Sequence, residues 1–171
     1  FPTFRCAEQT RNDIDYPNLP VVICAVGSGV TYGNLGYSHH AIQDISLMRA
    51  LPNMMIGTPC DPKEVVKILD YNFSNPKPLY LRLHKAGEKN LQDSEEQILP
   101  GQIRRINTPI EINTQSYTQK TCILCIGHIT NAVDRICKDE FQDLPIYSVP
   151  LWGASSSEYF AKQISQYKTI I

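Results

Sequence analysis

The sequence predicts an α/β protein made of two successive open, mostly parallel sheet units, both incomplete at their outer ends. Two observations support this class. Apolar runs that end at glycine or at polar residues are typical of strands buried on both faces. Segments with helical periodicity separate these runs, and the short connections imply parallel strands joined by right-handed crossovers. The alternation occurs twice, on either side of a polar stretch.

The first elements form a helix followed by a strand–helix–strand repeat. The opening helical segment is expected from about Arg5 to Asp15 and is ended by the sequence YPNLP. The run 20-PVVICAVG-27 predicts a buried strand. A glycine-rich loop then leads to a helix expected from about His40 to Ala50, and 51-LPNMMIGTP-59 predicts a short second strand.

The next helix has a clear start signal. Asp61 is a favourable N-cap, Pro62 suits the first helical position, and Glu64 follows the cap by three residues. The buried face of this helix is expected to comprise Val65, Val66, Leu69 and Phe73. The helix is expected to end at SNPKP, after which the run 78-PLYLRLH-84 predicts the third parallel strand.

A second, similar unit follows a polar linker. A lead-in strand is expected at 103–107 and a core strand in 121-TCILCIGH-128, followed by a helix from Thr130 to Phe141. A strand in 145–151 and a final helix from about Ser156 to Tyr167 complete the unit. The chain is therefore divided into a first unit at 1–88, a linker at 89–102 and a second unit at 103–171.

Charge and hydropathy exclude several classes of protein. With 16 basic and 17 acidic residues, the net charge of −1 gives no electrostatic reason to expect binding to nucleic acid or to an anionic membrane. No apolar run approaches the roughly 20 residues that span a bilayer. The opening sequence FPTFRCAEQT also lacks the layout of a signal peptide.

The six cysteines are scattered along the chain, several of them inside apolar runs. This distribution is typical of reduced, buried thiols in a cytoplasmic protein rather than of a disulfide framework. Cys122 and Cys125 spell C-x-x-C, but residues three apart on a strand point to opposite faces. A shared metal ion is therefore not expected there.

Three ordered stretches carry a family resemblance: 27-GSGVTYGNLGYSHHAIQDISLMRALPNM-54, 56-IGTPCDPKEV-65 and 78-PLYLRLHKAGE-88. Their order is a glycine loop, Ser-His-His, an acidic helix, Met-Arg-Ala-Leu-Pro-Asn-Met, an aspartate-capped helix and a strand ending in a basic residue. This order resembles the pyrimidine-binding domain of transketolases and of 1-deoxy-xylulose-5-phosphate synthases. The linker and the TCILCIGH unit resemble the C-terminal domain of the same enzymes.

The resemblance implies part of a transketolase-like enzyme that transfers a two-carbon ketol unit between sugar phosphates, with thiamine diphosphate and Mg²⁺ as cofactors. In such enzymes the cofactor supplies the carbanion chemistry, and the protein supplies binding, orientation and proton traffic. One domain of the family holds the diphosphate and Mg²⁺ through a Gly-Asp-Gly motif, and the pyrimidine-binding domain, usually of the partner subunit, holds the pyrimidine ring.

The chain contains no Gly-Asp-Gly motif. We therefore expect a second copy in a homodimer, or a companion subunit, to supply the diphosphate and Mg²⁺ site. The family's activating glutamate is expected upstream of residue 1, so the chain alone is expected to be an inactive portion of a longer enzyme. The alternatives are a deoxyxylulose-phosphate-synthase-like ligation, and a non-catalytic subunit or interaction module that retains the fold.

The resemblance also assigns candidate binding residues. His39 matches the family histidine that contacts substrate, and Lys85 falls where the family has an arginine that binds the substrate's phosphate. Lysine keeps the charge of that arginine but lacks its bidentate fork. Phe1 or Phe4 corresponds to the aromatic residue that stacks on the cofactor pyrimidine.

Each assignment has a plainer alternative. His39 and Lys85 could be solvated loop residues, and the phenylalanines could belong to the core. His40 is explained by helix capping, and Arg82 by a structural ion pair. Leu35 departs from the family, because transketolases carry a substrate-reading aspartate there, and the change puts ordinary pentose phosphate specificity in doubt.

Overall fold

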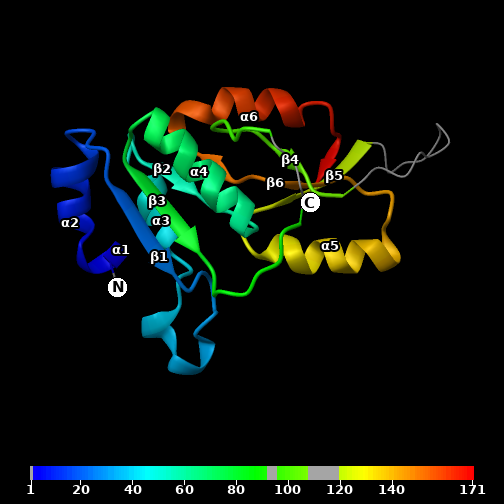
Figure 1. Ribbon diagram of the computed structural model, residues 1–171, viewed down its shortest axis with the longest axis horizontal. Helices are drawn as coiled ribbons and strands as arrows, with labels where there is room; N and C mark the ends of the chain where they lie inside the picture. The colour runs from blue at the N-terminus through cyan, green and yellow to red at the C-terminus, as the bar shows by residue number, and fades with distance from the viewer. Residues whose placement is uncertain (1, 92–95, 108–119) are drawn as a thin grey trace.

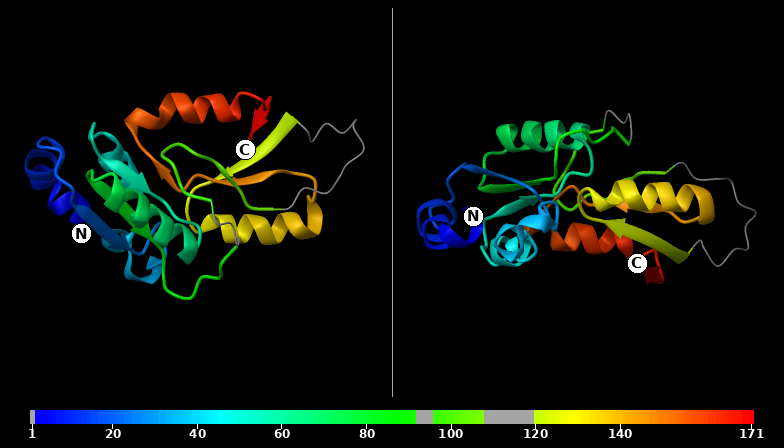
Figure 2. Two further views of the ribbon diagram at one scale, coloured as in Figure 1. Left: turned by 45° about the horizontal axis from the view of Figure 1, so that its top comes forward. Right: turned by 90° about the horizontal axis from the view of Figure 1, so that it is seen from below.

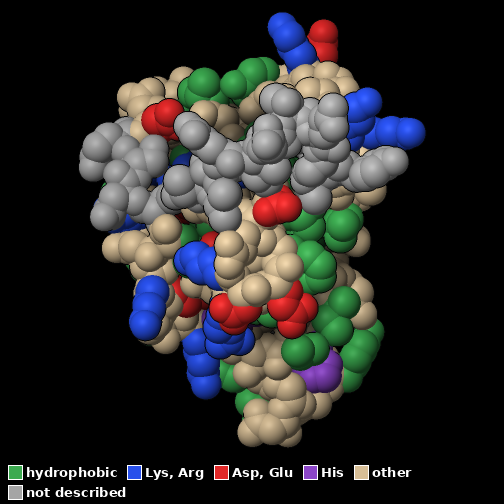
Figure 3. All heavy atoms as spheres, turned by 90° about the vertical axis from the view of Figure 1, so that its right-hand side faces the viewer, with side chains coloured by type: hydrophobic (Ala, Val, Ile, Leu, Met, Phe, Trp, Pro, Cys, Tyr) green, Lys and Arg blue, Asp and Glu red, His purple; other side chains and the backbone are tan. Residues whose placement is uncertain are grey.

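The computed structural model describes residues 2–91, 96–107 and 120–171, and it has the predicted α/β architecture with two four-stranded sheets (Figure 1). Within these ranges no helix is long and apolar enough to cross a bilayer. Basic and acidic side chains lie interspersed on the face shown in Figure 3, in keeping with the net charge of −1.

The first sheet has the strand order β1-β3-β2-β7. The three predicted strands pair in parallel, which confirms the crossover topology expected from the sequence. The fourth strand was not expected, because it comes from the second half of the chain and pairs with β2 antiparallel. The strands are β1 (Val22–Val26), β2 (Met55–Gly57), β3 (Leu79–Leu83) and β7 (Leu151–Trp152).

Helices cover both faces of the first sheet (Figure 2). On the α4 side the core includes Ile68, Leu79 and Leu81, and on the α3 side it includes Met48 and Tyr80. Alternate residues of β3 therefore face opposite layers, as expected for a strand buried on both faces. The helical segments are α1 (Pro2–Arg5), α2 (Ala7–Gln9), η1 (Thr10–Asp15), α3 (Asp44–Arg49) and α4 (Pro62–Ser74).

Helix α4 confirms the predicted start but corrects the predicted buried face. Asp61 accepts a hydrogen bond from the backbone N–H of Glu64, with Pro62 at the first position. However, Val66 is 58% exposed and Phe73 71% exposed. Val65 and Leu69 are partly buried against the core, as predicted, and the fully buried positions are Glu64, Ile68 and Asn72. The two buried polar side chains both have partners, since Glu64 pairs with Arg104 and Asn72 donates to the carbonyl of Lys77.

The second sheet has the order β4-β6-β5-β8. Strands β5 and β6 pair in parallel, as predicted, and the lead-in strand β4 pairs with β6 antiparallel. The strand β8 at the end of the chain was not expected, and it pairs in parallel with β5. The elements are β4 (Arg104–Arg105), β5 (Thr121–Cys125), α5 (Ile129–Glu140), β6 (Ile146–Ser148), η5 (Ala154–Ser156), α6 (Ser157–Ile164) and β8 (Thr169–Ile170).

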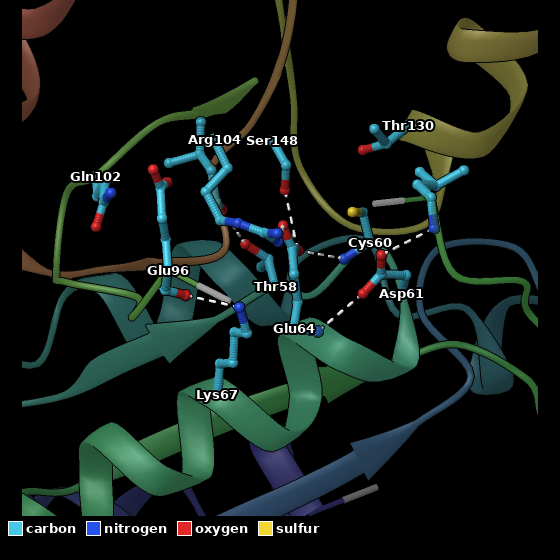
Figure 4. A network of polar contacts seen from close by, with 12 residues as sticks. Thr58, Cys60, Asp61, Glu64, Lys67, Glu96, Gln102, Arg104, Thr130 and Ser148 are labelled. Atoms are coloured by element: carbon cyan, nitrogen blue, oxygen red, sulfur yellow. Dashed lines mark hydrogen bonds and ion pairs between the residues drawn. The ribbon is translucent and has the colours of Figure 1, made fainter. Parts of the chain in front are cut away.

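A buried ion pair joins helix α4, which covers the first sheet, to the second sheet (Figure 4). Arg104 of β4 donates to Glu64 of α4 at 2.5 Å, and both side chains are buried. The second carboxylate oxygen of Glu64 accepts from the backbone N–H of Cys60 at 2.7 Å and from the hydroxyl of Ser148 at 3.0 Å. Burial raises the pKa of Glu64, while the Cys60 N–H and the Arg104 charge oppose that rise. The pair therefore fixes α4 against the second sheet.

Candidate functional site

The loops after β1 and β3 lie at the same edge of the first sheet, because parallel strands end at the same edge. This is where open α/β sheets bind ligands. The loop after β1 is closed at its base, since Gly29 and Ala41 exchange two backbone hydrogen bonds at 3.0 and 2.8 Å. It contains two short 3-10 turns, η2 (Gly33–Leu35) and η3 (Tyr37–His39).

The start of this loop requires glycine at position 27. Gly27 has a φ of +96°, a conformation that residues with a Cβ rarely adopt. A Cβ built at this position would lie 2.3 Å from the ring of Tyr32. The close approach of Tyr32 therefore explains this glycine without a role in phosphate binding.

The structure places His39 on the exposed end of η3, with Nδ1 3.0 Å from the hydroxyl of Ser38. The capping interpretation of His40 is wrong. Helix α3 begins at Asp44 rather than at about His40, and its N-cap is Gln43. The Nε2 atom of His40 instead lies 3.3 Å from the carbonyl oxygen of Gly33, so this ring makes a hydrogen bond within its own loop.

Lys85 is exposed immediately beyond β3, and its Nζ lies 5.5 Å from the ring centroid of Tyr32. An aromatic face at this distance attracts a cation, so Tyr32 orients the Lys85 ammonium without neutralising it. Lys85 also lines a cleft of about 360 Å³ together with His84 and Glu88. Lys85 is thus an exposed cation beside a cleft at the carboxyl edge of the first sheet.

Arg82 is a structural ion-pair partner, as the sequence interpretation allowed. Its Nε donates to Asp44 at 2.7 Å, and its Nη2 donates to the carbonyl of Ala41 at 2.6 Å. The same Asp44 oxygen accepts from the hydroxyl of Tyr80 at 2.8 Å. This group anchors the end of the His39 loop to β3 and α3.

The aromatic candidates differ in what the structure describes. Phe4 lies on α1 and is 60% exposed, so its ring is available for stacking rather than being a core side chain. Phe1 lies outside the described residues. Leu35, which departs from the family pattern, and Tyr37 are exposed on the same loop as His39.

Two further histidines meet at this edge, and the sequence interpretation missed both. The rings of His84 and His128 stack with centroids 3.6 Å apart and planes 7° from parallel. The hydroxyl of buried Ser28 lies 3.3 Å from Nδ1 of His84 and 3.2 Å from Nδ1 of His128. The available signal was positional, since each histidine follows an apolar run directly, in LYLRLH and in CILCIGH.

The surroundings of both histidines disfavour protonation. Burial lowers the pKa of His84, and the charges of Arg82 and Lys85 add to this effect. Burial also lowers the pKa of His128, followed by the effects of His84 and Arg82. Both imidazoles are therefore predominantly neutral at pH 7.

The described residues do not offer a magnesium site of their own. In the ranges 2–91, 96–107 and 120–171, no group of three or more His, Cys, Asp and Glu side chains is placed to hold a metal ion. The exposed ring of Phe4 fits one part of thiamine diphosphate, the pyrimidine, by its chemistry.

Comparison with known proteins gives concordant matches. Residues 1–88 match the family described as "Transketolase, pyrimidine binding domain". The chain is 35% identical over 99 residues to a subunit of the apulose-4-phosphate transketolase of Actinobacillus succinogenes, a match that covers 58% of this chain and 32% of that protein. It is 36% identical over 104 residues to a 1-deoxy-D-xylulose-5-phosphate synthase of Syntrophomonas wolfei, covering 60% of this chain and 16% of that protein.

A solved structure described as "Split gene transketolase, inactive beta4 tetramer" has a TM-score of 0.75. The similarity covers 99% of this chain and 53% of that one at 23% identity, and it supports the fold. The chain therefore spans about half of that structure and about a third or less of the two curated relatives.

Proposed function

The chain belongs to the family of the transketolase pyrimidine-binding domain, and on that premise we propose that it is part of a thiamine-diphosphate-dependent enzyme. This enzyme transfers a two-carbon ketol unit between sugar phosphates. The observation that carries the proposal is that His39 and Lys85 are both exposed on loops at the carboxyl edge of the first sheet. A second copy of the chain, or a companion subunit, holds the diphosphate and Mg²⁺.

Each candidate residue has a role that its chemistry supports. His39 hydrogen-bonds a hydroxyl of the sugar, since a neutral imidazole can both donate and accept. Lys85 binds the phosphate as a point charge. Phe4 stacks on the pyrimidine of thiamine diphosphate, and the bound cofactor supplies the carbanion chemistry. The boundaries proposed for the two units are 1–88 and 103–171, with a linker between them.

A second candidate function is the decarboxylating ligation of a deoxyxylulose-phosphate synthase. The 36% identity to the Syntrophomonas wolfei enzyme favours it. Formation of a product from pyruvate and glyceraldehyde phosphate by the complete assembly would distinguish this reaction from ketol transfer. A non-catalytic subunit is the third possibility, and the replacements at Leu35 and Lys85 support it.

The substitution Lys85→Met tests the phosphate role. Loss of hydrogen bonds to a charged group costs about 1.5–3 kcal/mol, so the KM for the sugar phosphate is expected to rise roughly 10- to 150-fold. Steady-state kinetics of the chain assembled with its partner subunit give this KM. Lys85→Arg, which restores the bidentate fork, is expected to keep the KM at or below that of the native chain.

Lys162→Met on α6 is the matched control, because it removes an exposed lysine from the second unit. Its KM is expected to equal that of the native chain. If Lys85→Met had the same KM as Lys162→Met, the phosphate role of Lys85 would be wrong.

A further inference from the structure

Four side chains meet where the two sheet units touch at the carboxyl edge of β1 and β3. Ser28 and Thr31 come from the loop that carries His39, and His84 directly precedes Lys85. His128 comes from the second unit, as the N-cap of α5 after β5. We call Ser28, Thr31, His84 and His128 the edge cluster.

The hydrogen bonds of the edge cluster define its proton positions. The hydroxyl of Thr31 donates to the carbonyl of Ser28 at 2.5 Å, so it can only accept from Nδ1 of His84, 2.8 Å away. His84 therefore carries its proton on Nδ1. The hydroxyl of Ser28 is then free to donate to Nδ1 of His128, and in that arrangement the proton of a neutral His128 lies on Nε2.

This arrangement needs His128 to be neutral, whereas His84 would keep its Nδ1–H in either protonation state. A protonated His128 would carry a hydrogen on Nδ1 and could no longer accept from Ser28. Three charged side chains lie near the two imidazoles: Arg82, Lys85 and Glu88. Arg82 is paired with Asp44, Lys85 lies just beyond β3, and Glu88 lines the same cleft as His84. A second cation stacked at 3.6 Å would add repulsion.

We propose that His128 is a positioning residue for the substrate site. It holds Ser28 by a hydrogen bond and His84 by stacking, and these two partners belong to the segments that carry His39 and Lys85. The second unit thereby fixes the distance between the two substrate contacts. The inference rests on the proposed function for its catalytic consequence, but the ordering of the two segments is a property of the chain itself.

The first test uses nuclear magnetic resonance of the chain and needs no activity. In His128→Phe, which retains an aromatic ring without Nδ1, the backbone amide signals of Thr31, His39 and Lys85 are expected to shift or broaden. His128→Asn, whose side-chain oxygen can accept from Ser28, is expected to restore part of the native spectrum. Arg135→Gln, an exposed change on the same helix, is the control and is expected to leave these signals unchanged.

The same experiment on the native chain covers the case in which His128→Phe does not fold. Lowering the pH from 7.5 to 5.5 is expected to shift the Thr31, His39 and Lys85 amide signals together with the ring signals of His84 and His128. In His84→Phe the pKa of His128 is expected to rise, because one of the groups that lowers it is removed. Amide signals that stay at their native positions while both rings titrate would overturn the proposal.

The second test is kinetic and uses the chain assembled with its partner subunit. His128→Phe is expected to lower kcat/KM for ketol transfer about 10- to 100-fold, since small displacements of positioned groups cost rates of this order. In the native enzyme, protonation of the edge cluster is expected to contribute to the fall of kcat/KM at acid pH. His128→Phe is expected to remove that contribution, whereas loss of a purely structural residue would leave the acid side of the pH profile unchanged. An unchanged acid side would contradict the positioning role.

The two tests separate two kinds of failure. A native assembly without ketol transfer would refute the proposed function while the amide signals still report whether His128 orders the two segments. Normal ketol transfer with native amide signals in His128→Phe would refute the positioning role and leave the proposed function intact.

Discussion

Arg104→Met is expected to lower the free energy of unfolding by about 3–5 kcal/mol, because it leaves the buried carboxylate of Glu64 without its cation. Among the described residues, Glu64 would keep Cys60 and the Ser148 hydroxyl as hydrogen-bond partners. Urea unfolding with a common m value measures the difference. The double variant Glu64→Gln/Arg104→Met is expected to recover part of the loss, because the uncompensated charge is then absent.

The chain provides a matched control for this prediction. Lys138 and Asp134 form an ion pair at 2.6 Å on α5, but Lys138 is 67% exposed. Lys138→Met is therefore expected to cost less than about 1 kcal/mol. If Arg104→Met and Lys138→Met lowered the free energy of unfolding equally, the buried pair of Arg104 and Glu64 would contribute no more than a surface ion pair.

Asp44→Ala is expected to lower the free energy of unfolding by about 2–3 kcal/mol, because Arg82 and Tyr80 both lose a charged acceptor. The effect on the site is expected to be larger than the stability change alone. Arg82 also holds the carbonyl of Ala41, so an unpaired Arg82 would loosen the closed end of the His39 loop. Urea unfolding and the kcat/KM of the assembled enzyme are the two measurements.

Asp70→Ala is the control, since Asp70 is exposed on α4. Its free energy of unfolding is expected to lie within about 0.5 kcal/mol of the native value. A loss in Asp44→Ala no larger than this would contradict the anchoring role of Asp44.

Local signals made most of the first sheet predictable from the sequence. The apolar run before Gly27 gave β1, and the aspartate, proline and glutamate after Cys60 gave the start of α4. The short strands β7 and β8 could not be predicted, because two residues carry no periodicity. Their positions are set by tertiary pairing with β2 and β5.

The polar residues on the buried face of α4 could not be predicted for a related reason. Glu64 is buried because Arg104, forty residues later, meets it, and a helical hydrophobic pattern cannot contain that information. The edge cluster likewise depends on His84 and His128 coming together from separate units. The family resemblance, by contrast, is confirmed over residues 1–88. The binding roles of His39, Lys85 and Phe4 stay predictions, because they concern ligands.

The most direct test of the proposed function is a ketol-transfer assay of the complete assembly. The protein and a companion subunit that supplies the diphosphate site are combined with thiamine diphosphate, Mg²⁺, a ketose phosphate donor and an aldose phosphate acceptor. Mass spectrometry of the products is expected to show the acceptor extended by two carbons, with the yield strongly reduced in His39→Ala. An intact assembly that binds the cofactor but extends no acceptor, or that forms product only from pyruvate, would contradict the proposal.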